Sequence, residues 1–90
     1  MTDTDAPKIT FPCDDYLIKV VGDTDETFRQ FVHSVLVQFD GRLTEASFSI
    51  NVSRNGRFES LTVRMRIERE SHLTELFELL KADTRVRMVL

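Results

Sequence analysis

The chain has 90 residues, of which 41% are hydrophobic and 30% are charged, with three Gly and two Pro. This length predicts one domain, and the composition is that of a compact globular domain, which excludes a disordered or collagen-like chain. A single Cys excludes an internal disulfide framework and a thiolate zinc site, so we expect a reducing, cytoplasmic setting. No apolar run approaches the roughly 20 residues of a membrane helix, and the N-terminus is acidic where a secretion signal is basic.

The net charge of -3 arises in the first fifteen residues, where four Asp face one Lys. From residue 16 onward, eleven acidic residues balance eleven basic ones. This neutral body lacks the surplus of Lys and Arg that general nucleic-acid binding requires. Residues 1–10 are polar, acidic and without periodicity, and they predict a mobile tail before a single domain over residues 11–90.

The first predicted strand covers residues 16–21, an aromatic and β-branched run between Asp14-Asp15 and Gly22. Asp23 then stands three residues before Glu26, a spacing that predicts a helix cap at Asp23. The apolar side chains of this helix recur every three or four residues: Phe28, Phe31, Val32, Val35, Leu36 and Phe39. We expect the helix to end at Asp40-Gly41, with Gly41 in a left-handed conformation.

The next strand is predicted by strict alternation over residues 46–54. Its inward side chains are expected to be Phe48, Ile50 and Val52. Asn55-Gly56 predicts a type I′ hairpin, because both residue types tolerate positive φ angles. The third strand pairs back antiparallel and carries apolar side chains on its inner face: Leu61, Val63, Met65 and Ile67.

A second helix is expected after Ser71, its predicted cap. Its apolar stripe consists of Leu73, Leu76, Phe77 and Leu80. The last strand covers residues 85–90, with the inward side chains Val86, Met88 and Leu90.

The order β-α-β-β-α-β predicts an α+β ferredoxin-like sandwich, in which a four-stranded antiparallel sheet carries two helices on one face. In the usual order of this fold the first and third strands are central. Lys19, Arg64 and Arg66 are then expected near the middle of the other face, which the helices leave open.

No catalytic constellation is evident, so we expect a protein that is not an enzyme, without a metal or cofactor. Cys13 is the only thiol and has no base beside it in sequence, which favours a small buried residue. His33 and His72 lack the spacing of a metal-binding pair and are expected at the surface. Glu75 and Glu78 lie three residues apart on an exposed helix face and form no convincing acid/base pair.

The open sheet face is the remaining candidate site, with a merely solvated face as the alternative. Arg side chains held on a rigid sheet bind carboxylates and phosphates. A partner protein or a small anionic effector is therefore expected at Lys19, Arg64, Arg66 and Arg87. The edge of the second strand offers pairing with a second copy, which would give a homodimer.

Weak binding of single-stranded RNA is the alternative function. RNA-recognition domains with this plan stack bases on aromatic side chains of their first and third strands. Here the third strand presents Thr62, Arg64 and Arg66 outward, and only Phe58 echoes such a motif. Nucleic acid is therefore disfavoured as a partner.

Four short segments resemble the YbeD family of small bacterial cytosolic proteins. They are Phe11-Pro-Cys-Asp14, Ile18-Lys-Val-Val-Gly22, the hairpin Ser53–Ser60 and the ending Val86-Arg-Met-Val-Leu90. The resemblance implies a fold similar to regulatory ACT domains, which bind amino acids or other small effectors, often across a dimer interface. It implies regulation or interaction more than catalysis. In ACT modules effector contacts are made between the first strand and first helix, where Asp23 could hold an ammonium group besides capping the helix.

Overall fold

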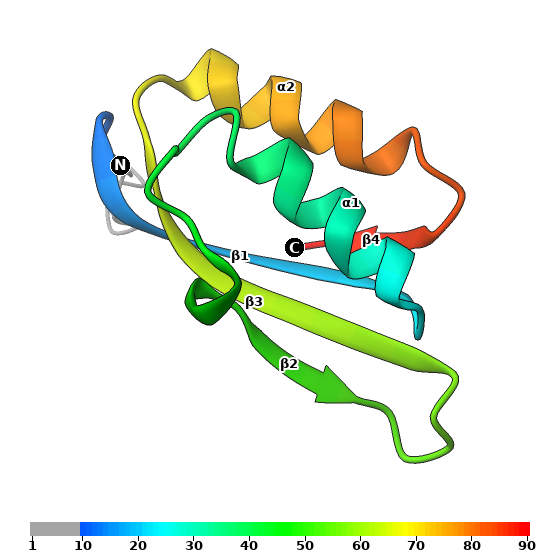
Figure 1. The fold of residues 1–90 in the computed structure, drawn as a ribbon. Coiled ribbons are helices and arrows are strands. Elements are labelled where there is room, and N and C mark those ends of the chain that lie inside the picture. Colours follow the sequence, from blue (N-terminus) through cyan, green and yellow to red (C-terminus); the bar gives the residue numbers. More distant parts are fainter. Residues whose placement is uncertain (1–9) are drawn as a thin grey trace, which may run out of the picture.

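The computed structural model describes residues 10–90, so the predicted mobile tail lies, except for Thr10, outside the described residues. The elements in chain order are β1 (Cys13–Asp23), α1 (Glu26–Leu36), β2 (Ser49–Val52), β3 (Phe58–Ile67), α2 (Glu70–Lys81) and β4 (Val86–Val89). The strands form one antiparallel sheet in the order β2-β3-β1-β4, and both helices lie on one side of it (Figure 1). The predicted ferredoxin-like sandwich, with the first and third strands in the centre, is confirmed.

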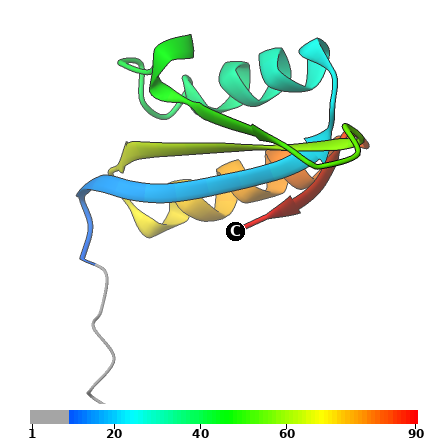
Figure 2. The same cartoon turned by 90° about the horizontal axis from the view of Figure 1, so that it is seen from below.

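The core lies between the sheet and the two helices. Its largest fully buried apolar side chains are Phe28, Ile18, Leu36, Leu61, Met65, Ile67, Leu76, Leu80, Val20 and Val32. Removing such a side chain from water contributes about 1.5–3 kcal/mol. The opposite side of the sheet carries no helix, and Figure 2 shows β1 and β3 from this side with α2 behind them. Within residues 10–90 the helices are too short to cross a membrane.

Both predicted helix caps are wrong by two residues. β1 continues to Asp23, whose N–H donates to the carbonyl of Arg85 at 3.1 Å. The helix α1 therefore begins later, and Asp25 caps it by accepting a hydrogen bond from the Thr27 N–H at 2.9 Å. The cap position of α2 is Arg69, two residues before Ser71, and its side chain makes no capping hydrogen bond.

The end of α1 and the following strand also differ from the expectation. The helix ends at Leu36, and Gly41 does not have a positive φ angle. Residues 45–47 form a 3₁₀ turn, so β2 is only four residues long. In the hairpin Gly56 alone has a positive φ (77°), which excludes the predicted type I′ turn because that turn needs two such residues.

The last strand presents different side chains to the core than predicted. Gly22 pairs with Val86 and Val21 pairs with Met88, so the register shifts between these two pairs. Val86 and Val89 pack against the core, whereas Met88 and Leu90 are 51% and 60% exposed. The extra residue of this bulge moves Met88 and Leu90 to the open face.

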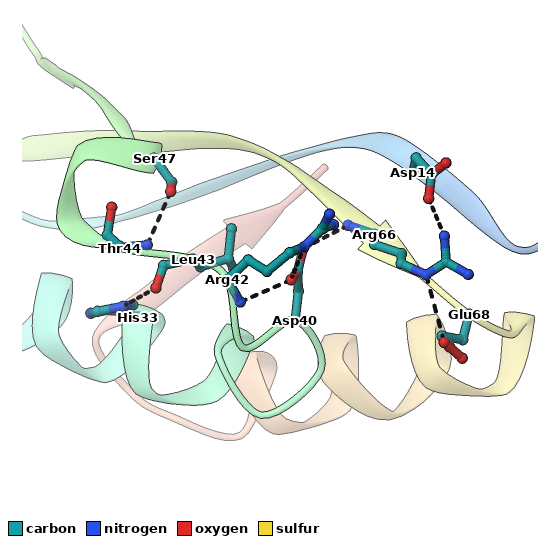
Figure 3. Close-up of polar contacts among 9 residues, drawn as sticks. All are labelled: Asp14, His33, Asp40, Arg42, Leu43, Thr44, Ser47, Arg66 and Glu68. Atoms are coloured by element: carbon teal, nitrogen blue, oxygen red, sulfur yellow. Dashed lines mark hydrogen bonds and ion pairs between the residues drawn. The ribbon is translucent and has the colours of Figure 1, made fainter.

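An Asp-x-Arg clip follows each helix. After α1, the buried Asp40 carboxylate accepts from the Arg42 N–H at 3.1 Å and from the Arg42 guanidinium at 3.0 and 3.2 Å (Figure 3). After α2, Asp83 receives the same three bonds from Arg85, at 2.8 to 2.9 Å. The Arg side-chain hydrogen bonds are the largest cause that lowers the pKa of Asp40 and of Asp83 to about 2.

Asp40 also connects the loop after α1 to the sheet. The second carboxylate oxygen of Asp40, Oδ2, accepts a hydrogen bond from the backbone N–H of Arg66 at 3.0 Å. This N–H belongs to β3 beyond the end of its pairing with β2, which covers residues 59–62 of β3. Asp40 therefore occupies a backbone donor on the uncovered part of β3.

Asp40→Asn is expected to destabilise the domain by about 1.5–3 kcal/mol at pH 7, because hydrogen bonds to a buried charged group are lost. The pKa of Asp40 in the folded protein, about 2, lies below its ordinary value of 3.8. Its stabilisation is therefore complete above pH 3.8 and is lost as the pH falls towards 2. Urea unfolding of wild type and variant should show a difference at pH 7 that shrinks in acid. The exposed Glu75→Gln serves as control, and an equal loss in both variants would contradict this role of Asp40.

Candidate interaction surface

The register of β1 and β3 defines the open face, the side of the sheet that faces away from the helices. Leu17, Lys19 and Val21 of β1 alternate with the buried Ile18 and Val20. Their partners across β3 are, in the same order, Arg64, Thr62 and Ser60. The open face therefore carries Lys19, Arg64 and Arg66 together, as the alternation predicted.

The Arg side chains on this face are not free. Arg64 lies 3.2 Å from a carboxylate oxygen of Asp15. Arg66 pairs with Asp14 and lies 3.6 Å from Glu68. These pairs are largely exposed, so each stabilises the fold by little, about 0–1 kcal/mol. Each still places a carboxylate where an anionic ligand would have to bind.

Asp23 and Arg87 form a pair of their own. The Arg87 guanidinium donates to the Asp23 carboxylate at 3.0 Å, and its Cζ lies 5.9 Å from the centre of the Phe58 ring. Asp23 therefore holds β4 to β1 and does not cap α1. Of the four predicted cations, only Lys19 has no ion-pair partner within residues 10–90.

An apolar stripe runs across the open face, where the sequence predicted mainly polar groups. It consists of Leu17, Val21, Phe58, Met88 and Leu90. Leu17 and Met88 are about half exposed, at 50% and 51%, and Leu90 is 60% exposed. Leu90 lies on this face because its backbone exchanges two hydrogen bonds with Lys19, at 2.8 and 3.1 Å. Val21, which is half-buried, pairs with Met88 across β1 and β4. Large exposed apolar patches are typical of binding surfaces, which makes this stripe a candidate.

The other residues singled out in the sequence have structural surroundings. Cys13 is half-buried at the start of β1. His33 and His72 were predicted at the surface, but both are half-buried and lie against aromatic rings, at 5.6 Å and 5.9 Å between ring centres. Glu75 and Glu78 are exposed. In the described part of the chain, no three His, Cys, Asp or Glu side chains gather as metal ligands would.

A buried ion pair between α1 and β3 was missed by sequence reasoning. The Glu59 side chain is fully buried, and its Oε2 lies 3.2 Å from Nε of the partly exposed Arg29. No hydrogen bond from residues 10–90 reaches either Glu59 oxygen. Burial raises the pKa of Glu59, and the charge of Arg29 opposes this rise. The signal in the sequence was one acidic residue at an inward position of an alternating strand.

Arg29 also lines a groove of about 530 Å³ between α1 and β2. Its apolar lining comes from Val37, Phe48, Ile50 and Leu61. Its polar lining comes from Glu26, Arg29, Gln30, His33, Ser34 and Glu45. This groove lies on the helix side of the sheet, so it is separate from the open face.

Comparison with known proteins identifies the family of this chain. A family described as "Protein of unknown function (DUF493)" matches residues 6–90. The chain belongs to this family. Its relatives include the UPF0250 proteins of Azotobacter vinelandii and Hahella chejuensis, which are 42% and 38% identical over 100% of both chains. The resemblance to YbeD-type proteins is confirmed, since UPF0250 proteins are of this type.

Solved structures agree with the fold of this DUF493 member. The solution structure of Helicobacter pylori HP0495 superimposes with a TM-score of 0.72 at 26% identity, covering 98% of this chain and 91% of that chain. The ACT domain of GTP pyrophosphokinase from Chlorobium tepidum gives a TM-score of 0.59 at 18% identity, covering 84% and 96%. The predicted ACT-like fold is therefore confirmed.

Proposed function

We propose that this DUF493 protein is a non-catalytic regulatory module that docks a partner protein through its open face. The observation that carries the proposal is the apolar stripe, whose members Leu17, Met88 and Leu90 are half exposed or more. Covering apolar surface contributes about 25 cal/mol per Å², so an apolar partner surface is favoured there. The ACT-like fold supports a regulatory role, and action in the cytoplasm is part of the proposal.

A protein fits this face better than a small anionic effector. An anion would need the guanidinium groups of Arg64, Arg66 and Arg87, and each of these already faces a carboxylate. A protein surface needs only the apolar stripe at its centre, because ion pairs at the rim of an interface contribute little. Lys19 remains available for a carboxylate of the partner.

Single-stranded RNA has less support than a protein. Stacking of bases needs aromatic side chains on the sheet face, and the stripe offers only Phe58. The Arg87 guanidinium lies over that ring. Most of the exposed apolar area is aliphatic, which suits protein side chains.

Affinity capture with matched variants tests the proposal. Leu17→Asp with Met88→Asp places two carboxylates in the apolar stripe, whereas Leu79→Asp changes a 45% exposed Leu on α2. A genuine partner, once identified and purified, should bind wild type and Leu79→Asp alike. Its Kd for the Leu17→Asp/Met88→Asp variant should rise roughly 100-fold, since apolar anchors contribute about 1–3 kcal/mol each.

Two outcomes would contradict the proposed docking of a partner protein. Equal binding of the partner to all three proteins would remove the apolar stripe from consideration. Recovery of nuclease-sensitive material alone would favour RNA over a protein partner. In either case the double charge reversal Arg64→Glu/Arg66→Glu would show whether the ion-paired side of the open face contributes.

Self-association is the other partnership that we propose, and it uses the edge of the sheet. This leaves the open face free in each copy, so both proposals hold together. A homodimer would present two apolar stripes to its partner proteins.

A further inference from the structure

The three uncovered edges of the sheet differ in how they are protected. On β3, Asp40 occupies the backbone N–H of Arg66 beyond the pairing with β2. On β4, the register shift interrupts the pairing and Arg87 brings a charge. The four residues of β2, Ser49-Ile-Asn-Val52, contain no charge and no Pro, and their pairing with β3 is regular. Since charges, Pro and bulges are the usual protection of an edge strand, β2 is the unprotected edge.

The backbone of β2 has groups free for pairing on its outer side. The Ser53 N–H donates inward to the carbonyl of Phe58 at 2.7 Å. Backbone groups alternate in direction along a strand, so Asn51 also faces β3, while Ile50 and Val52 direct their N–H and C=O groups outward. These are the groups to which another strand would bind.

The side chains of the same two residues lack cover. Ile50 and Val52 pair with Leu61 and Glu59, whose side chains point to the helix side. They nevertheless remain 46% and 54% exposed. Ile50 forms part of the groove wall opposite α1. A strand added outside β2 would bring its own side chains against these two.

We propose that a second copy of this chain binds along β2 in antiparallel orientation, on a two-fold axis through Asn51. In this register Ile50 lies opposite Val52 of the second copy, and Val52 lies opposite Ile50. Both pairs are outward-facing, so each exchanges two backbone hydrogen bonds. The result is one continuous sheet in which all four helices lie on the same side.

The edge is self-complementary in this arrangement, as a two-fold interface requires. Apolar Ile50 meets apolar Val52 on the helix side, so the exposed pair of one copy covers that of the other. Antiparallel pairing also brings the acidic end of one edge, at Glu45, towards the basic end of the other, at Arg54 and Arg57. All three of these side chains are exposed. The second copy would close the outer side of the groove between α1 and β2.

The oligomeric state of the full chain tests this inference, which rests on the self-association proposed above. Sedimentation analysis should show a concentration-dependent dimer for wild type and for Leu79→Lys. Ile50→Lys/Val52→Lys should be monomeric with an unchanged melting temperature, because both side chains are exposed in the single chain. A wild type that stays monomeric at millimolar concentration, or a dimer that survives both Lys substitutions, would overturn it.

Cross-linking tests the register itself. Across the two-fold axis the two Asn51 residues form a non-hydrogen-bonded pair, with Cα atoms about 4.5 Å apart, within the range of a disulfide. In a Cys13→Ser background, Asn51→Cys should give an oxidised dimer. Ser49→Cys should not, because its opposite residue is Ser53 and the second Ser49 lies about 13 Å along the strand. Cross-linking of Ser49→Cys alone would contradict the register.

The outcomes separate the two proposals. If the wild-type protein is monomeric and the Leu17→Asp/Met88→Asp variant no longer binds the partner protein, docking through the open face stands and β2 pairing fails. If Ile50→Lys/Val52→Lys is monomeric and still binds the partner, the two surfaces act independently.

Discussion

Gly22→Ala is expected to destabilise the domain by about 3 kcal/mol, the upper range for overpacking of a core. A Cβ at this buried position would lie 2.5 Å from the carbonyl oxygen of Arg85 and 2.7 Å from Cδ1 of Phe28. The Arg85 carbonyl is backbone and accepts from the Asp23 N–H, so it cannot move without loss of that bond. Phe28 is fully buried in the core, so its ring can move away only by displacing the side chains packed around it.

The other two Gly residues provide matched controls for this prediction. At Gly41 a Cβ meets nothing within 4 Å, and φ is not positive, so Gly41→Ala should be neutral or slightly stabilising. At Gly56 there is equal space but φ is +77°, so Gly56→Ala should cost about 1–2 kcal/mol through the backbone alone. Urea unfolding of all three variants measures these differences. Equal stability of Gly22→Ala and Gly41→Ala would contradict the close packing around Gly22.

Arg29→Met should cost about 3–5 kcal/mol at pH 7, because it leaves the Glu59 carboxylate buried without Arg29, its one ion-pair partner among residues 10–90. Removal of the exposed part of the Arg29 side chain should itself change the stability little, since Met keeps the aliphatic packing of the Arg29 side chain. The expected effect therefore comes from Glu59, whose side chain has no exposure and no hydrogen bond from residues 10–90. Thermal and urea unfolding at neutral pH measure the loss.

The pH dependence of this variant identifies the cause. The pKa of Glu59 in the folded protein is raised by burial above the ordinary value of 4.5, so the folded state binds protons more tightly than the unfolded state. Stability then decreases as the pH rises through the raised pKa, and it recovers as the pH falls towards 4.5. The deficit of Arg29→Met should accordingly shrink in acid.

The double variant Arg29→Met/Glu59→Met is the decisive control. Replacing a buried ion pair by apolar side chains is often neutral or stabilising. The double variant should be more stable than Arg29→Met at pH 7. If both lose the same stability, packing around Arg29 and not the buried charge is responsible.

The periodic parts of the sequence were sufficient to predict the order of the elements. In β3 the alternation of Leu61, Val63 and Met65 with polar residues matches the inner and outer faces of the sheet. In α1 the spacing of Phe28, Val32 and Val35 matches its buried side. These patterns succeed because each repeats over several turns or strand residues, so one misplaced residue does not change the result.

The candidate site could be predicted only in part. The alternation placed Lys19, Arg64 and Arg66 on one face correctly. It could not show that Asp14 and Asp15 reach Arg66 and Arg64, because these residues are about fifty positions apart in the chain. The Asp-x-Arg spacing occurs after each helix, at Asp40 and at Asp83. It could be interpreted as a structural motif only once both helix ends were known.

The amino-acid sequence was enough to predict the fold class of this protein, the central position of β1 and β3, and the balanced charge of its body. These follow from local periodicity and composition. The tertiary structure decided what the surface offers: the bulge in β4 turned Met88 and Leu90 outward, and the short β2 remained uncovered by α1. One extra residue in a strand moves every following side chain to the opposite face of the sheet. Whether an edge strand is covered depends on how far a helix that is distant in sequence extends over it.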